Sequence, residues 1–139
     1  MQLVTPYLHF DGNCREAMTF YKDAIGGDLS IQTVGESPAA QHMPKDVHNQ
    51  VMHARLGAGN EAFLMASDTM GHMKVNSGNG ISLALDCRSD AEIKSRFEKL
   101  SAGGKVNQPL AEQFWGATYG QLTDKFGIDW MLNYQKNPQ

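Results

Sequence analysis

Two histidines stand in stretches where apolar and polar residues alternate, and they are the first candidates for chemistry. His9 lies between two apolar residues, and His53 lies between Met52 and Ala54. Because successive side chains of a strand point to opposite faces, both imidazoles would point away from their apolar neighbours. Histidine exchanges protons near neutral pH, so His9 is the best candidate for a catalytic base and both could anchor a ligand. A hydrogen-bonded structural histidine fits the same pattern.

The other reactive residue types give weaker signals. Cys14 would begin a helix, where the helix dipole lowers the pKa of a thiol, but no base stands near it in the sequence and a nucleophile is not expected. His42, His48 and His72 fall in predicted loops, where exposure is the ordinary outcome. The run from Met70 to Met73 could hold a soft metal ion, and a mobile linker explains it equally well.

The elements that would position these residues occur twice in the chain. One constant offset along the sequence places Leu8 on Leu85 and Phe20 on Phe97, and it superposes two Gly-Gly pairs. A second, shorter offset places Met65 on Met131. Each Gly-Gly pair ends a predicted helix, since glycine adopts the left-handed conformation that a helix C-terminus favours. The helices would begin at capping boxes formed by Asn13 with Glu16 and by Ser89 with Glu92.

These patterns predict an α+β fold of two βαβββ modules within one domain, residues 1–139. The modules would span about residues 1–67 and 80–134, joined by residues 68–79. Helices are predicted at about 14–25 and 90–102, and strands at about 3–10, 28–34, 48–56, 61–67, 80–87, 105–109, 116–123 and 128–134. Leu8, Phe10 and Trp130 should face the helices. The opposite faces of the curved mixed sheets, turned inward, would form a groove for a small ligand.

Composition excludes several classes of partner. The 139 residues carry a net charge of −3, and acidic and basic residues are interspersed, so no nucleic acid or acidic membrane is expected. No apolar run approaches the roughly 20 residues that span a bilayer, and the first ten residues do not resemble a signal peptide. Two cysteines without a metal or disulfide spacing are typical of reduced thiols, so we expect a soluble cytoplasmic protein.

Several segments, taken in order, resemble a known family along nearly the whole chain. The sequence is similar to PhnB-like proteins of the vicinal-oxygen-chelate (glyoxalase/bleomycin-resistance/dioxygenase) superfamily. Lys125 stands where that family usually has proline. The matching segments are Pro6–Ala17 with Phe20 and Tyr21, Val51–Leu56, Ser67 with Asp68, Phe114–Gly120 and Thr123–Trp130.

The resemblance implies paired βαβββ modules, a homodimer and a ligand site within each cup of sheet. Metal-dependent relatives hold a divalent cation that stabilises an oxyanion. Carried over by position, the metal ligands of those relatives fall on Thr5, Met65, Gly80 and Met131, none of which supplies an imidazole or a carboxylate. We therefore expect neither a metal nor another cofactor.

Three functions follow from this resemblance. The leading hypothesis is metal-free binding of a small apolar or aromatic molecule, and the runner-up is a lyase or isomerase of glyoxalase type that uses His9 or a metal site elsewhere. A structural dimer with a vestigial pocket is the third. Some relatives are also named demethylubiquinone methyltransferases. This chain shows no glycine-rich nucleotide loop that could bind a methyl donor, so we discount this activity. The predicted ligand-binding residues are Tyr7, His9, His53, Phe63, Met65, Trp115, Tyr119 and Met131. The sequence does not identify the ligand.

Overall fold

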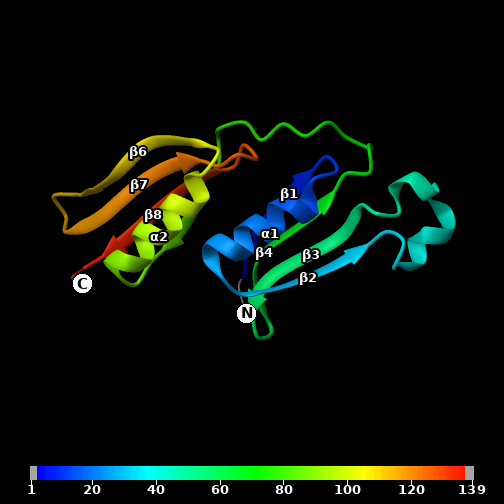
Figure 1. The fold of residues 1–139 in the computed structure, drawn as a ribbon, viewed down its shortest axis with the longest axis horizontal. Helices are drawn as coiled ribbons and strands as arrows, with labels where there is room; N and C mark the ends of the chain where they lie inside the picture. Colours follow the sequence, from blue (N-terminus) through cyan, green and yellow to red (C-terminus); the bar gives the residue numbers. More distant parts are fainter. Residues whose placement is uncertain (1–2, 137–139) are drawn as a thin grey trace. The chain divides into compact units, whose positions relative to one another are not determined.

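The computed structural model describes residues 3–136 and divides the chain into two compact units (Figure 1). Unit 1 spans Met1–Asn76 and unit 2 spans Ser77–Gln139. Each unit contains the predicted order of strand, helix and three strands. The prediction of an α+β fold built from two βαβββ modules is therefore confirmed.

Unit 1 forms a four-stranded mixed sheet in the order β1-β4-β3-β2. The first strand pairs in parallel with the last, and the other two pairings are antiparallel. The connection from β2 to β3 carries two short 3-10 helices, η1 and η2, which the sequence patterns did not indicate. The elements are β1 (Tyr7–Phe10), α1 (Cys14–Ile25), β2 (Asp28–Thr33), η1 (Pro38–His42), η2 (Lys45–Val47), β3 (Val51–Ala58) and β4 (Glu61–Asp68).

Unit 2 repeats this topology with the strand order β5-β8-β7-β6. Again the first strand pairs in parallel with the last, and the remaining pairings are antiparallel. Its elements are β5 (Leu83–Asp86), α2 (Asp90–Ser101), β6 (Lys105–Glu112), β7 (Ala117–Thr123) and β8 (Asp129–Gln135).

The first strand of each unit is shorter than predicted. β1 begins at Tyr7 instead of residue 3, and β5 begins at Leu83 instead of residue 80. Leu83 pairs with Trp130, the second residue of β8, so residues before Ser82 lie beyond the start of their partner strand. In unit 1 the register between β3 and β4 shifts at Phe63, just beyond the pairing of Tyr7 with Met65.

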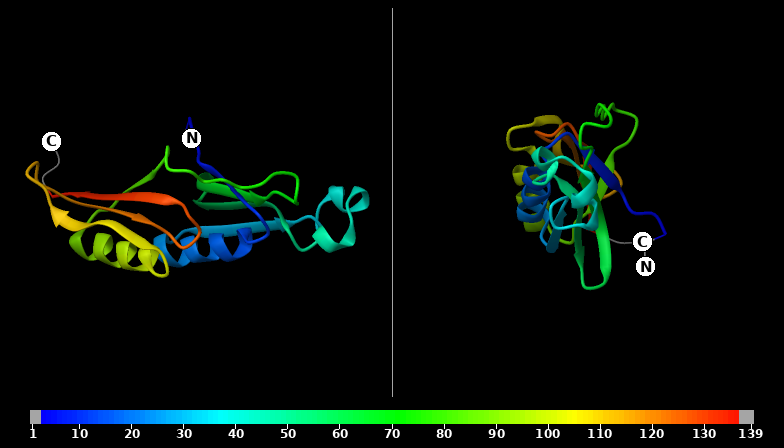
Figure 2. Two further views of the ribbon diagram at one scale, coloured as in Figure 1. Left: turned by 90° about the horizontal axis from the view of Figure 1, so that it is seen from above. Right: turned by 90° about the vertical axis from the view of Figure 1, so that its right-hand side faces the viewer.

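One face of each sheet is covered by the helix of the same unit (Figure 2). In unit 1, side chains three or four residues apart on α1 pack onto β3 and β4, and this spacing matches the helical repeat. The buried residues of this core include Ala17, Met18, Tyr21, Ala54, Leu56, Leu64 and Ala66. Phe10 is also buried, and Leu8 is paired with Ala66, so the prediction that both face the helix is confirmed.

The core of unit 2 is built in the same way. Ile93, Phe97 and Leu100 of α2 are buried together with Leu122, Trp130 and Leu132 of the sheet, which confirms the predicted core position of Trp130. Gly120 of β7 lies below Phe97, and a Cβ there would come within 2.8 Å of the Phe97 ring. A glycine in this strand thus lets the aromatic ring approach the backbone.

The predicted capping box of α1 is wrong. Asn13 makes no side-chain capping bond. Instead Asp68, buried at the end of β4, accepts hydrogen bonds at Oδ1 from the backbone N–H groups of Gly12 (2.9 Å) and Cys14 (3.0 Å). Its Oδ2 accepts from the N–H of Val51 at 2.8 Å. A full negative charge at a helix N-terminus outcompetes the neutral amide of Asn13.

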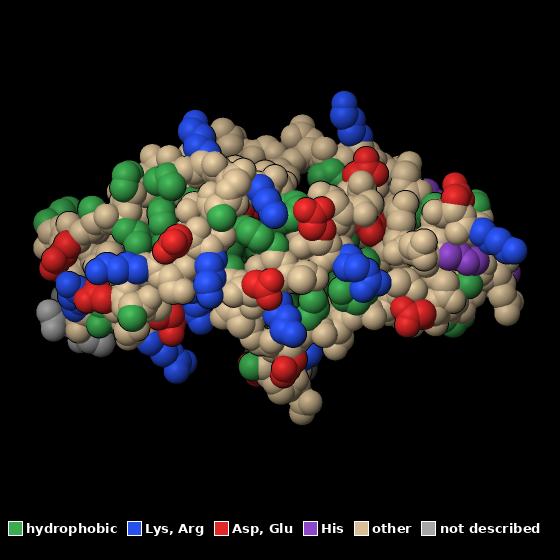
Figure 3. Space-filling model, in the orientation of Figure 1, with side chains coloured by type: hydrophobic (Ala, Val, Ile, Leu, Met, Phe, Trp, Pro, Cys, Tyr) green, Lys and Arg blue, Asp and Glu red, His purple; other side chains and the backbone are tan. Residues whose placement is uncertain are grey.

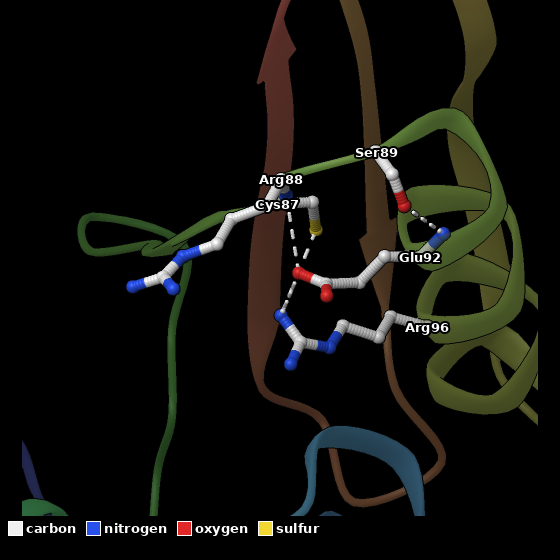
Figure 4. A network of polar contacts seen from close by, with 5 residues as sticks. All are labelled: Cys87, Arg88, Ser89, Glu92 and Arg96. Carbon is white, nitrogen blue, oxygen red and sulfur yellow. Dashed lines mark hydrogen bonds and ion pairs between the residues drawn. The ribbon is translucent and has the colours of Figure 1, made fainter.

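The capping of α2 follows the prediction more closely (Figure 4). Ser89 Oγ accepts from the backbone N–H of Glu92 at 3.1 Å, as the box requires. The Glu92 carboxylate accepts from the N–H of Arg88 at 3.1 Å, one residue before the predicted donor. It also pairs with Arg96 Nη1 at 2.8 Å, and that guanidinium lies 4.0 Å from Cys87 Sγ.

The histidines predicted to lie in loops have different environments. His42 and His72 are exposed, as expected. His48 is half-buried, and its Nε2 lies 3.1 Å from the carbonyl oxygen of Ala40 and 3.0 Å from that of Met43. His48 therefore holds the loop around η1 in place, and its predicted exposure is wrong.

Candidate functional site

The face of the unit 1 sheet that lies opposite α1 carries polar and aromatic side chains, and we call it open face 1. Residues that are paired across strands share a face, so the register defines rows across the sheet. One row contains Tyr7, Met65, Arg55 and Ser30. The next row contains His9 with Ser67 and His53 with Gln32. The predicted orientation of both histidines away from the helix is confirmed.

Three rings gather on this face, and we call Tyr7, His9 and His53 the ring cluster. The ring centroids of Tyr7 and His9 are 5.3 Å apart, and those of Tyr7 and His53 are 6.0 Å apart. His9 is exposed, His53 is half-buried, and 39% of Tyr7 is accessible. Met65 lies beside Tyr7 in the neighbouring strand. The cluster thus offers aromatic surface and hydrogen-bonding nitrogens at one place.

Phe63 does not belong to this cluster. Its ring lies 3.1 Å from the position that a Cβ on Gly27 would take, at the end of the sheet where β2 begins. The register shift between β3 and β4 falls at this residue, because Leu56 pairs with Leu64 but Gly57 pairs with Ala62.

The face of the unit 2 sheet that lies opposite α2 is open face 2, and it holds the other predicted ligand residues. Tyr119 is paired with Asn133, and Met131 lies between Gln121 and Ala84. The Tyr119 hydroxyl accepts a hydrogen bond from Gln121 Nε2 at 2.7 Å.

Aromatic residues continue from Tyr119 to the tip of the β6–β7 hairpin. The rings of Trp115 and Tyr119 have centroids 6.5 Å apart, and those of Phe114 and Trp115 are 5.0 Å apart. Trp115 is 46% exposed and Phe114 is 98% exposed. Phe114 was not among the predicted site residues, although it stands directly before Trp115.

The positions carried over from metal-dependent relatives do not supply metal ligands in either unit. Thr5 and Gly80 precede β1 and β5, and the residues paired with Met65 and Met131 in those strands are Tyr7 and Ala84. Within residues 3–136, no three His, Cys, Asp or Glu side chains are grouped so that they could hold a metal ion. A phenol, a methyl group and two thioethers are poor ligands for a hard divalent cation.

Both cysteines are buried, and their thiols are less acidic than usual. Burial and the neighbouring Asp68 carboxylate raise the pKa of Cys14 to about 12, against a smaller opposing effect of Arg15. The expectation that the helix dipole lowers this pKa is therefore wrong, because burial of the thiol outweighs the dipole and the Asp68 carboxylate at the helix N-terminus raises the pKa further. Burial likewise raises the pKa of Cys87, and the Arg96 guanidinium only partly opposes it.

Acidic and basic side chains are interspersed over the face drawn in Figure 3. No described helix is long and apolar enough to cross a membrane.

Comparison with known proteins agrees with this architecture. A glyoxalase/bleomycin resistance protein/dioxygenase from Nocardioides superposes with a TM-score of 0.57 at 19% identity, covering all of this chain and 87% of that one. This likeness concerns the fold alone, and it defines the class as the glyoxalase/bleomycin-resistance/dioxygenase fold that the sequence resemblance implied.

Within this class, the chain belongs to the family described as 3-demethylubiquinone-9 3-methyltransferase, whose model matches residues 2–133. Protein PA1353 from Pseudomonas aeruginosa is 40% identical with a TM-score of 0.85, and 99% of this chain and 100% of that chain are covered. The PhnB protein from Bacillus cereus is 27% identical with a TM-score of 0.76, over 96% and 99% of the two chains. Protein YjdN from Escherichia coli K12 is 35% identical, over 96% of this chain and 95% of YjdN. The predicted PhnB-like membership is confirmed.

Sequence reasoning missed two members of the rows on open face 1. Arg55 follows His53 by two residues, and Ser67 follows Met65 by two residues. The same alternation that indicated His53 and Met65 therefore places Arg55 and Ser67 on the same face.

Proposed function

We propose that the protein binds a small apolar or aromatic molecule without a metal ion, and that open face 1 is the principal site. The observation that carries the proposal is the ring cluster of Tyr7, His9 and His53 beside Met65. Aromatic rings attract one another at centroid separations of about 4.5–7 Å. A flat ligand placed against Tyr7 gains such a contact, and the polarizable sulfur of Met65 adds to it.

Open face 2 is the second surface that supports binding of this kind. Trp115, Tyr119 and Met131 supply aromatic and thioether surface, and the bond from Gln121 fixes the Tyr119 hydroxyl. A ring held by its neighbours loses little conformational freedom when a ligand packs on it.

The methyltransferase activity in the family description has less support from these residues. Nucleotide-containing donors commonly bind at a helix N-terminus that follows a strand. In unit 1 the N–H groups of Gly12 and Cys14 at this place already bind the Asp68 carboxylate. In unit 2 the Ser89 hydroxyl accepts from the N–H of Glu92, and the Glu92 carboxylate accepts from the N–H of Arg88, at the start of α2.

The proposal is tested by titrating the protein with a neutral bicyclic aromatic compound, 2-naphthamide, and following backbone amide shifts by NMR. We expect saturable binding with a Kd of about 1 mM or tighter, as small ligands of this size allow. Tyr7→Ala should weaken binding about tenfold by removing the ring contact. Tyr119→Ala is the matched control, because it removes the same side chain from open face 2 and leaves open face 1 intact.

Three results would contradict the proposal. If Tyr119→Ala weakens binding and Tyr7→Ala does not, the principal site is open face 2. If 2-naphthamide and related neutral aromatics do not bind at millimolar concentration, the binding function itself is wrong. Turnover of a 2-oxoaldehyde with glutathione that disappears in His9→Ala would favour the glyoxalase-type lyase instead.

A further inference from the structure

We propose that the ligand of open face 1 is an aromatic acid, with its ring on Tyr7 and Met65 and its carboxylate beside His9, Ser67 and His53. This inference rests on the proposed function and adds the chemical class of the ligand. It starts from the donors in the row next to Tyr7. Imidazole nitrogens and a serine hydroxyl can all donate hydrogen bonds to a carboxylate, and an imidazole keeps one N–H donor when neutral.

The spacing of the two histidines suits a carboxylate between them. His9 is paired with Ser67, and continuing the β3–β4 ladder by one residue beyond the pair of Ala54 and Ala66 brings His53 opposite Ser67. The two histidines therefore stand on either side of Ser67, about 10 Å apart at Cα because neighbouring strands are spaced by about 4.8 Å. The ring of Tyr7 lies 5.3 Å from that of His9 and 6.0 Å from that of His53 between centroids, so the three rings gather on this part of the sheet.

The charges of this face also favour an anion. The two described rows that contain the ring cluster hold no carboxylate, and they hold Arg55, whose Nη2 donates to the carbonyl oxygen of Gly59 at 3.2 Å. The nearest carboxylate on the same face along β2 is Asp28, which lies one row beyond Ser30 and opposite Gly57. Asp68 is on the other face, and its two oxygens accept three backbone hydrogen bonds. An anion bound above Ser67 would therefore have hydrogen-bond donors on both sides, and no carboxylate in these two rows would repel it.

The second repeat of the chain provides an internal comparison. The sequence offset that relates the first strands, Leu8 to Leu85, also places His9 on Asp86. The offset that relates the last strands places His53 on Tyr119 and Arg55 on Gln121. Each of the three basic residues of open face 1 is therefore acidic or neutral at the equivalent position of open face 2. The two sheets share one architecture, but the positions of open face 2 that are equivalent to His9, His53 and Arg55 carry no imidazole or guanidinium.

Hydrogen bonds to a carboxylate are about twice as strong as those between neutral groups. The ligand's acidic group should therefore supply much of the affinity. Its aromatic ring gains the same contacts with Tyr7 and Met65 whether or not an acid is attached. This difference allows the two contributions to be measured separately with one pair of compounds.

The test compares 2-naphthoate with 2-naphthamide, which have the same ring system and nearly the same shape but differ in charge. Both are titrated at pH 7 and low salt, with Kd measured by NMR. We expect 2-naphthoate to bind at least tenfold more tightly. His9→Gln and His53→Gln should each reduce this ratio severalfold, and the double variant should bring it close to one. His72→Gln, in an exposed turn, is the matched control and should keep the ratio.

Equal affinity of the wild-type protein for both compounds would overturn the inference and leave the proposed aromatic site standing. Failure of both compounds to bind would overturn the proposed function and the inference with it. A tenfold preference that survives in the double histidine variant would place the carboxylate elsewhere and overturn the inference alone. Amide spectra of each variant in the absence of ligand show whether it is folded, since His9 is exposed and His53 is only half-buried.

Discussion

The Asp68 carboxylate accepts a hydrogen bond from the backbone N–H of Cys14 at 3.0 Å, although the two residues are 54 positions apart in the chain. The same side chain accepts from the N–H groups of Gly12 and Val51. One buried residue therefore connects the end of β4, the start of α1 and the start of β3. Asp68 contributes to unit 1 by joining elements that no local sequence signal connects.

Replacing this carboxylate should destabilise the protein strongly. In Asp68→Asn the amide retains one oxygen acceptor, but its NH₂ group faces a backbone N–H, so at least one buried donor loses its partner. We expect the free energy of unfolding to fall by about 3 kcal/mol. Urea denaturation measures it, with Asp11→Asn as the control, since that exposed residue undergoes the same change in charge and should cost less than about 0.5 kcal/mol. A similar effect in both variants would contradict this role of Asp68.

The Cys14 thiol should be unreactive in the folded protein. Its pKa of about 12 lies above the ordinary value of 9.0, so at pH 8 its thiolate fraction is about 10³-fold lower than that of a free thiol. In a Cys87→Ala background, Ellman's reagent should label Cys14 only as fast as the protein unfolds. Because the folded pKa is raised, the contribution of this thiol to stability is complete below pH 9 and declines as the pH rises towards 12. Labelling of the folded protein at the rate of a free thiol would contradict the prediction.

We expect no divalent metal to bind on either open face. Met65 and Met131 stand at two carried-over ligand positions, and Tyr7 and Ala84 are paired with them in the first strands. A hard cation placed there would lose water without gaining compensating ligands. Ni²⁺, Zn²⁺ and Mn²⁺ should therefore leave the melting temperature unchanged, since a ligand stabilises only a state that it binds. A rise of several degrees that disappears in His9→Ala would overturn the metal-free proposal.

A homodimer is expected from the resemblance, and sedimentation at micromolar concentration should give about twice the 15.3 kDa of one chain. Phe114 is 98% exposed in the single chain, so Phe114→Ser cannot disturb a packed core. If this ring lies in the dimer contact, the variant should shift the equilibrium towards monomer. Met73→Ser changes another exposed apolar residue, in unit 1, and should leave the equilibrium unchanged. A wild-type protein that sediments as a monomer would contradict the expectation.

The sequence predicted the helices well because their signals are local. The Gly-Gly pairs and the preceding apolar spacing predicted α1 at 14–25 and α2 at 90–102, and the structure has Cys14–Ile25 and Asp90–Ser101. The capping of α1 was missed because its acceptor comes from Asp68, far along the chain. The starts of β1 and β5 were missed because the pairing of an edge strand depends on its partner: β8 begins at Asp129, and the register of β4 shifts at Phe63.

The sheet face on which each site residue lies was predictable from the sequence, but the residues that surround it in the fold were harder to predict. Alternation correctly placed His9 and His53 opposite the helix, and it also contained the information for Arg55 and Ser67. Phe63 lies at one end of the sheet beside Gly27, next to a register shift that can be recognised from two paired strands but not from either strand alone. The spacing of the ring cluster likewise depends on the order β1-β4-β3, which brings β4 between strands that carry one histidine each.

The pairing of the first strand with the last has a consequence for biosynthesis. In unit 1, β1 remains without its sheet partner while α1, β2 and β3 emerge from the ribosome, because β4 is made last. Asp68, the final residue of β4, completes the sheet and caps α1 at the same moment. All the strands of this sheet lie before residue 69, so none of its pairings waits for unit 2. Unit 1 can therefore fold while unit 2 is still being translated, which is how domains commonly fold on the ribosome.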